Sequence, residues 1–224
     1  MNRTLSFVKL DYLTIKPYLT IKNLLLLLLV FVFIGYGTGE SSVLIGMLMM
    51  YSTIYASYPF AAEDRNKIGM LYATLPITKN RIVAGRYLFT LGLNAVVGIL
   101  SFVISALLMT VLKKGFNGEE ALTNSLVCFI LFSILEAIQL PIYFKFGYMK
   151  AKFLVYLPLA AFPAAVIAIS TFVGKSNFFP LRERMFLWGR EHRLHVAVIA
   201  LLVWLLAMLC SERLSYRFYR KREL

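Results

Sequence analysis

The chain has 224 residues, of which 60% are hydrophobic and only 16% are charged. Soluble domains are about half apolar and about a quarter charged, so this composition indicates an integral membrane protein. A hydrocarbon core about 30 Å thick needs roughly 20 apolar residues per helix, which leaves room for about six spans and none for a soluble catalytic domain. The net charge of +13 does not indicate nucleic-acid binding, because the Lys and Arg residues lie at the ends of apolar runs, where topology signals and headgroup contacts are expected.

The N-terminal residues 3–16 favour an amphipathic helix that lies at the membrane interface without crossing it. The alternative is an ordinary N-terminal extension of the first span. Pro17 marks a break, or the first turn of the next helix. The apolar positions that predict the interfacial helix recur at three- and four-residue spacing, with charged residues between them: Leu5, Val8, Tyr12 and Ile15.

Six apolar runs follow this segment, and we expect each of them to cross the membrane. Their approximate bounds are 19–36, 43–62, 87–112, 122–144, 153–173 and 194–210. Cys128 and Cys210 fall inside these runs and are interpreted as packing residues, not as a disulfide or a metal site. The sequence therefore predicts one all-α integral membrane domain over residues 1–224.

The distribution of Lys and Arg predicts the orientation of these spans. The N-terminus, the loop 63–86, the loop 145–152 and the C-terminal tail lie on one side and carry 17 of the 24 basic residues. We therefore expect both termini and the loop 63–86 in the cytoplasm, and the loop 174–193 outside the cell. Five basic residues in 174–193 conflict with this orientation, which we keep because an odd number of spans would disturb the other loops more.

The loop 63–86 combines charged residues with an apolar stripe, which a flexible linker would not need. Two acidic residues at its start suit a helix N-terminus, Pro76 ends that helix, and Thr78 is the predicted N-cap of a second helix that runs into the third span. We expect the first helix to dock on a partner protein; the alternative is a solvated connector, which explains the charges but not the stripe. The residues predicted to make this contact are Glu63, Asp64, Arg65, Lys67, Ile68, Leu71, Tyr72 and Leu75.

Glu136 is the ionisable residue that the fourth span places deepest in the membrane. A charge there costs roughly 3 kcal/mol on insertion scales, so such residues usually face the interior of a bundle and have a partner. Gln139, one turn along the same face, is the expected partner. Two interpretations stay open: Glu136 and Gln139 belong to a translocation pathway or its gate, or they hold helices together.

No motif for catalysis appears in the chain. It has no Gly-x-x-x-x-Gly-Lys-Ser/Thr loop for nucleotide phosphates, and no His-x-x-x-His or Cys-x-x-Cys pair for a metal. Glu119 and Glu120 resemble the double glutamate of some intramembrane proteases, but Asn124 stands where the following Arg belongs. We therefore expect a protein that is not an enzyme, with no catalytic residue, no metal and no cofactor of its own.

Two segments resemble signatures of the permeases of the bacterial ABC-2 transporter family. The first is the acidic pair Glu63-Asp64, followed by Leu75-Pro76 and by the sequence Ile-Val-Ala-Gly-Arg-Tyr at 82–87. The second is Pro-Ile-Tyr-Phe-Lys-Phe-Gly at 141–147, at the end of the fourth span. With six spans, the resemblance covers essentially the whole chain.

The resemblance implies the membrane subunit of an ABC exporter in the bacterial plasma membrane. Such subunits dimerise, here with a second copy or a paralogue, and separate cytoplasmic ATPase subunits that bind ATP and Mg dock on a coupling helix between spans two and three. The resemblance also implies an elbow helix before the first span and short re-entrant helices in the loop 174–193.

Within this family the chain resembles the permeases of phenol-soluble-modulin exporters. That type implies the export of amphipathic or antimicrobial-type peptides, or of other lipophilic substrates. The alternative function is a self-sufficient secondary transporter or a membrane scaffold protein. Secondary carriers usually contain internal repeats and several charges within the membrane, and the sequence has no such repeat and one clear buried acid.

Overall fold

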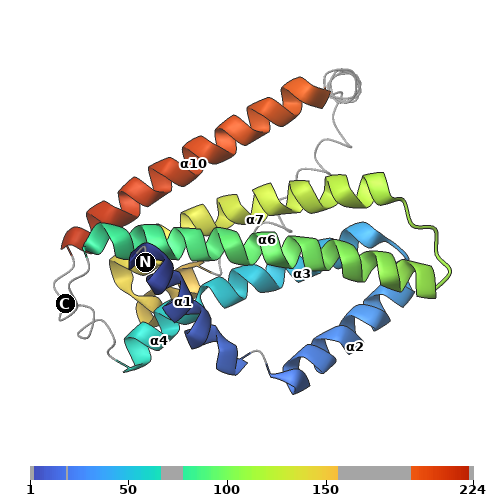
Figure 1. Cartoon of the computed structure of the whole chain (residues 1–224), viewed down its shortest axis with the longest axis horizontal. Helices are drawn as coiled ribbons and strands as arrows, with labels where there is room; N and C mark the ends of the chain where they lie inside the picture. The colour runs from blue at the N-terminus through green and yellow to red at the C-terminus, as the bar shows by residue number, and fades with distance from the viewer. Residues whose placement is uncertain (1–2, 19, 67–77, 156–192, 222–224) are drawn as a thin grey trace.

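The structure is a computed structural model of the chain, and it describes residues 3–18, 20–66, 78–155 and 193–221 (Figure 1). These described residues form helices and connecting turns, with no strand among them. Residues 148–155 are helical as well. The other elements are α1 (Arg3–Ile15), a short 3-10 turn (Lys16–Tyr18), α2 (Ile21–Thr38), α3 (Ser41–Ala56), α4 (Tyr58–Asn66), α6 (Lys79–Val111), α7 (Gly118–Phe146) and α10 (Arg193–Lys221).

Four helical stretches of the described chain are long and apolar enough to cross a membrane: Ser41–Arg65, Lys79–Val111, Gly118–Phe146 and His195–Lys221. They overlap the second, third, fourth and sixth predicted spans. Within α2 the apolar helix Leu28–Thr38 is shorter. Most of the predicted fifth span and of the loop 174–193 lies outside the described residues, so the total of six spans stays a prediction. The chain is an all-helical, multi-pass membrane protein.

The long helices α6 and α7 run side by side, with α3 and α10 packed against them and α1 crossing α6 near its start (Figure 1). The main apolar core lies at the end of the bundle where α1, α4, α6, α7 and α10 meet, and it is formed by Phe7, Phe60, Ile82, Val83, Tyr87, Ala137, Leu140, Tyr143, Phe144, Ala151, Val155, Met208 and Tyr219. Elsewhere the long helices expose apolar side chains such as Leu107, which is 61% exposed. Lipid tails cover such faces without cost, since they are as apolar as leucine.

Helix α1 occupies the predicted N-terminal segment, but its buried face is not the predicted stripe. Phe7, Asp11 and Ile15 are buried, whereas Tyr12 is 53% exposed. Phe7 reaches the backbone of α6 at Gly85, where a Cβ atom would lie only 3.1 Å from the Phe7 ring. Apolar spacing alone does not distinguish a face that meets lipid from one that meets protein, so the predicted stripe stays a prediction. The interfacial position of α1 stays a prediction.

The N-terminus of α6 is where the sequence predicts it. Thr78 has the extended backbone of an N-cap, although its side chain forms no capping hydrogen bond, and α6 begins at Lys79. The first eight residues of α6 therefore belong to the predicted loop, and α4 runs into that loop from the other side as far as Asn66. What separates the two helices is 67–77, a segment outside the described residues.

Helix α10 continues eleven residues past the predicted end of the last span and stops at Lys221. Ser211 and Ser215 are buried on this extension and face Tyr87 of α6. The Tyr87 hydroxyl lies 2.5 Å from Ser211 Oγ and 2.8 Å from Ser215 Oγ. Ser211 also donates to the carbonyl oxygen of Ala137 in α7. Small hydroxylated residues thus let α10 approach α6 and α7 closely, as is common between membrane helices.

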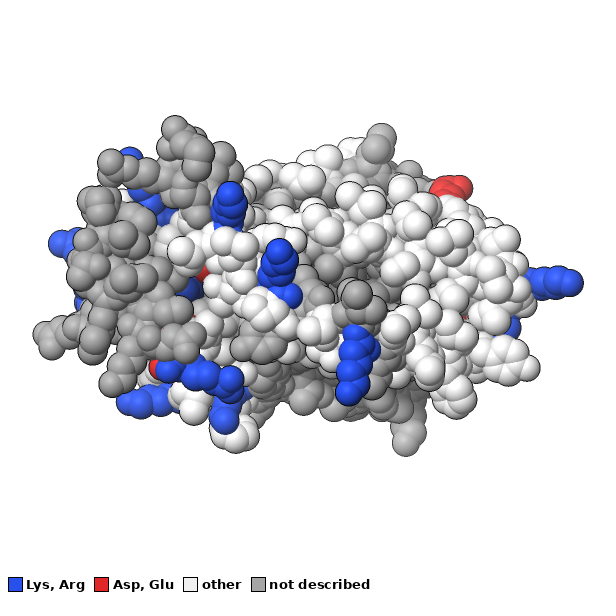
Figure 2. All heavy atoms as spheres, turned by 60° about the horizontal axis from the view of Figure 1, so that its bottom comes forward, with Lys and Arg blue, Asp and Glu red and all other residues white. Residues whose placement is uncertain are grey.

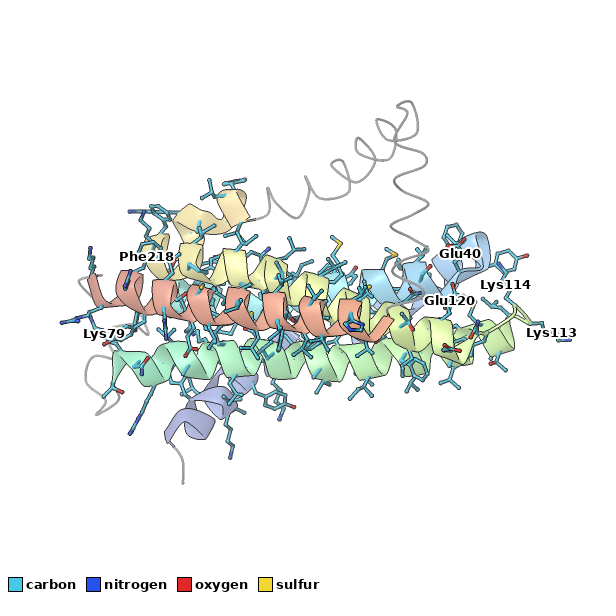
Figure 3. All side chains as sticks on the ribbon, turned by 90° about the horizontal axis from the view of Figure 1, so that it is seen from above. Glu40, Lys79, Lys113, Lys114, Glu120 and Phe218 are labelled. Carbon is cyan, nitrogen blue, oxygen red and sulfur yellow. The ribbon has the colours of Figure 1, made fainter. Side chains whose placement is uncertain are left out.

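Charged side chains concentrate at the two ends of the bundle. Lys79 and Phe218 mark one end, and Glu40, Lys113, Lys114 and Glu120 mark the other (Figure 3). On the face seen in Figure 2, most Lys and Arg side chains lie toward the end that holds the C-terminus. This pattern agrees with helices that cross a membrane between the two ends.

Candidate functional site

A buried ion cluster centred on Arg86 joins three helices. Arg86, on α6, is 1% exposed. Its Nη2 atom lies 2.7 Å from Oε2 of Glu63 on α4, and its Nε atom lies 3.7 Å from Oδ2 of Asp11 on α1. All three side chains are at most 8% exposed. Since an isolated buried charge costs several kcal/mol, the three groups depend on one another.

Aromatic rings enclose the same guanidinium group. The Arg86 Cζ atom lies 4.0 Å from the centre of the Phe60 ring and 6.0 Å from the rings of Phe7 and Phe144. Phe60 in turn stacks on Tyr143 and meets Phe144 edge-on. A cation over an aromatic face is stabilised by the ring quadrupole, and more so away from water. The rings add α7 to the three helices that the ions join.

The charge state of Asp11 depends on this burial. Desolvation raises the pKa of Asp11 to about 6, although the nearby Arg86 guanidinium lowers it, and the Glu63 carboxylate contributes a further rise. At neutral pH Asp11 is therefore ionised beside the Arg86 guanidinium. One cation shared by two acids from different helices acts as a three-way connection.

The sequence predicted the acidic pair of the docking helix at the start of a helix, but the structure places it at the end of one. Glu63 and Asp64 belong to the last turns of α4 and do not begin a new helix, because α4 starts at Tyr58. Glu63 turns inward to Arg86, and Asp64 Oδ2 accepts a hydrogen bond from the backbone N of Met149 at 3.0 Å, at the start of the helical residues 148–155. A carboxylate suits that helix N-terminus.

Of the other predicted docking residues, Arg65 belongs to the described part of the chain. Arg65 is exposed at the end of α4. The role of the whole set in docking stays a prediction. The remaining five lie outside the described residues: Lys67, Ile68, Leu71, Tyr72 and Leu75.

A second buried polar cluster lies midway along the helices, around Glu136. Glu136 Oε2 accepts a hydrogen bond from Asn94 Nδ2 at 2.5 Å. Asn94 Nδ2 also reaches Ser133 Oγ at 3.3 Å, and Asn94 Oδ1 accepts from Ser52 Oγ at 2.5 Å. These contacts connect α3, α6 and α7 through groups that are each buried. The arrangement favours the interpretation that Glu136 holds helices together, and its role in translocation or gating stays a prediction.

Gln139 is not the partner of Glu136, which corrects the expectation from the sequence. Its Nε2 atom donates to the carbonyl oxygen of Val155 at 3.3 Å, which ties α7 to the helical residues 148–155. The partner is Asn94, because α6 presents this amide directly opposite Glu136. Asn94 is a lone amide in a long apolar run, which is the signal in the sequence that would have indicated it.

A family model described as "ABC-2 family transporter protein" matches residues 6–220. The chain belongs to the ABC-2 transporter family. A comparison with curated proteins found no significant match. Membership supports a permease subunit of an ABC transporter and implies a cytoplasmic ATPase as its partner. It also suggests a permease without a nucleotide-binding domain of its own.

In this permease, the two segments that carry the family resemblance pack together. The first contributes Glu63 and Arg86, and the second contributes Tyr143 and Phe144, which contact Phe60 beside the guanidinium. Gly147 ends α7 with a positive φ of 74°, a conformation that glycine adopts without strain. In this chain the two segments build one buried cluster.

Replacing Arg86 by Met leaves two carboxylates buried without a cation. We expect R86M to lower the free energy of unfolding by about 3–5 kcal/mol, and the neutral triple variant D11N/E63Q/R86M to recover most of that loss. Thermal unfolding in detergent micelles measures both. R81M, which removes an exposed cation from the same helix, is the control and should unfold like the wild type. Equal losses in R86M and the triple variant would contradict the cluster.

Stability should depend on pH through Asp11. Its folded-state pKa of about 6 exceeds the ordinary value of 3.8, so between these values the unfolded chain binds fewer protons than the folded chain. Stability therefore falls as the pH rises through this window, by no more than roughly 3 kcal/mol, and is level above it. Unfolding midpoints from about pH 4 to about pH 7 measure this, and the slope should vanish in D11N but persist in E120Q.

Two substitutions at Glu136 separate its possible roles. E136Q keeps an oxygen that accepts from Asn94 and should unfold within about 1 kcal/mol of the wild type, whereas E136L strands that amide and should cost about 1–3 kcal/mol. Unfolding and transport are measured in parallel. Normal transport in E136Q with destabilised E136L supports a structural role; a stable E136Q that has lost transport would assign Glu136 to the pathway.

Proposed function

We propose that this permease is the membrane half of an ATP-driven exporter, and that it carries no catalytic group. A separate ATPase subunit, which binds ATP and Mg, drives it from the cytoplasm. The ATPase contacts the predicted docking stretch 63–75 beyond the buried Glu63, beginning with Arg65 at the exposed end of α4. Residues 3–16 act as the elbow helix, and 174–193 form the outer loop between the last two of six spans.

The observation that carries this proposal is the ion cluster at Arg86. The α4 helix leads into the segment 67–77 and α6 leads out of it, and Glu63 and Arg86 join the two helices near these points. A displacement of the intervening segment would therefore act on both helices at once, and on α1 through Asp11. Packed, rigid helices transmit such a displacement because their interfaces do not deform continuously.

The charge distribution supports a cytoplasmic position for the end of the bundle that holds the Arg86 ion cluster, called the cluster end below. At the opposite end the described basic residues are Lys113, Lys114 and Arg193, the first residue of α10, beside the acids Glu40, Glu119 and Glu120. The cluster end carries the exposed basic residues of α4, α6 and α10. An excess of Lys and Arg marks the cytoplasmic side of membrane proteins.

A second permease subunit, a copy or a paralogue, completes the transporter. Apolar side chains along α6 at helical spacing support such a contact: Val96, Ile99, Val103 and Leu107 are each at least 45% exposed. The substrate class we propose is amphipathic or antimicrobial-type peptides, or other lipophilic molecules, that enter sideways from the inner leaflet. Such substrates reach a pathway between helices without a soluble binding domain.

Reversing the charge of Arg65 tests the docking surface. We expect R65E to insert and fold normally but to lose copurification with a coexpressed partner ABC ATPase, and to lose acceleration of its ATP hydrolysis. The exposed charge pairs with an acidic partner surface, so reversal creates repulsion. K113E reverses an exposed charge at the opposite end and should behave like the wild type. Wild-type assembly of R65E would contradict docking at this point, and a wild-type permease that purifies alone would favour the secondary transporter or scaffold.

A further inference from the structure

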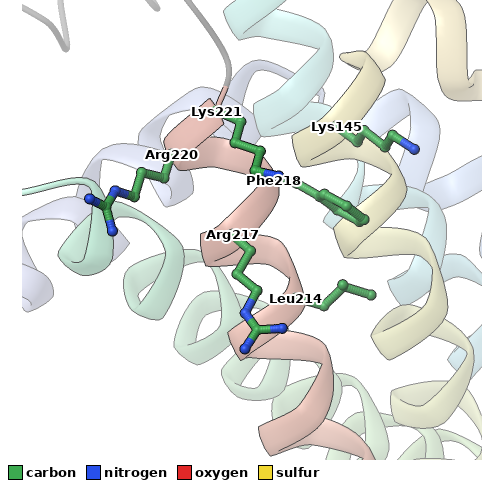
Figure 4. A pocket seen from close by; sticks show the side chains of 6 residues that line it. All are labelled: Lys145, Leu214, Arg217, Phe218, Arg220 and Lys221. Atoms are coloured by element: carbon green, nitrogen blue, oxygen red, sulfur yellow. The ribbon is translucent and has the colours of Figure 1, made fainter.

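A basic cavity lies at the same end of the bundle, between the C-terminal ends of α7 and α10 (Figure 4). Its volume is about 950 Å³. One residue of α7 and five of α10 line it: Lys145, Leu214, Arg217, Phe218, Arg220 and Lys221. Four of these six are cations and none is an acid.

The cations of this cavity have no acidic partner within the described part of the chain. Lys145 Nζ instead lies 5.1 Å from the centre of the Phe218 ring and 4.8 Å from that of Phe146. In Figure 4 Arg220 points away from the other side chains, whereas Lys145 borders the cavity from α7 and Arg217 and Lys221 border it from α10. Because no acid of the described chain neutralises these cations, all three attract an anion bound in the cavity.

An exposed apolar stripe continues from the cations toward the middle of both helices. On α10, Leu214 is 43% exposed and Cys210, one turn deeper, is also exposed. On α7, Ile138 lies two turns before Lys145 and is 49% exposed. Spacings of four and seven residues place these side chains on the same faces as the cations. The site is therefore cationic at the end of the helices and apolar along them, the pattern of an amphiphilic ligand.

We propose that this cavity binds the headgroup of an anionic phospholipid, with its acyl chains along the apolar stripe of α7 and α10. Basic pockets between membrane helices suit phosphate-bearing headgroups. Lys79 of α6 donates to the carbonyl oxygen of Arg220 at 3.4 Å, so the bound lipid lies next to the contact between α10 and the start of α6. The site needs only that α7 and α10 cross a membrane, and it does not depend on the proposed docking of an ATPase.

Spin-labelled lipids test this site in the full chain, reconstituted in nanodiscs of phosphatidylcholine. The measurement is the association of labelled phosphatidylglycerol relative to labelled phosphatidylcholine. We expect the wild type to prefer phosphatidylglycerol, and K145Q/R217Q/K221Q to lose this preference by about five-fold for each cation removed. The control R81Q/K150Q/R213Q removes the same charge at the same end, outside the cavity, and should keep the preference. R217Q alone serves the same test if the triple variant does not fold.

Each result decides the proposal. Persistence of the lipid preference when soluble glycerol phosphate is added supports a lipid site, whereas its loss would assign the cavity to a free phosphate ester. Equal loss in the cavity triple and the control triple, or no preference in the wild type, would overturn the site. A cavity triple that keeps the lipid preference but fails to assemble with the ATPase would show that the surface docks protein instead.

Discussion

The Arg86 guanidinium is buried, so it needs carboxylates and aromatic rings around it in place of water. This requirement constrains how the helices pack at the end of the bundle where Arg86 lies. Asp11, Glu63 and Phe60 meet it from two other helices. The pairing is worth little in net stability, but breaking it costs about 3–5 kcal/mol, since the remaining charges stay buried. The cluster thus specifies which helices come together more than it stabilises them.

Two of the buried polar centres in the described part of the chain lie at different positions along the bundle. The centre at Glu136 and Asn94 fixes α3, α6 and α7 midway along the helices. The centre at Arg86 fixes α1, α4 and α6 at one end, next to the segment where we propose that the ATPase docks. Helix α6 belongs to both, so it links the docking end to the part of the bundle within the membrane.

Features that depend on local sequence could be predicted. Long apolar runs predicted the helices that can cross a membrane, Thr78 predicted the start of α6, and two short segments identified the ABC-2 family. Each of these features depends on residues that are close together in the sequence, because span length, helix caps and family signatures are local properties.

Features that depend on contacts between distant residues could not be predicted. Asp11 was counted as a polar residue between apolar positions, yet it is buried because Arg86, 75 residues later, lies opposite it. Glu136 was paired with its helical neighbour, and its partner Asn94 comes from another helix. Ser211 and Ser215 look polar in sequence, although they are buried against the Tyr87 hydroxyl of another helix in the structure.

The most direct test of coupling through Arg86 uses D11N/E63Q/R86M, which removes the ionic connection and which we expect to keep the fold. The measurement is ATP hydrolysis by the ATPase subunit, with and without this permease, in proteoliposomes. Coupling through the cluster predicts that the triple variant still assembles with the ATPase but no longer accelerates hydrolysis. Acceleration equal to that of the wild-type permease would contradict it, and would leave the cluster with a purely structural role.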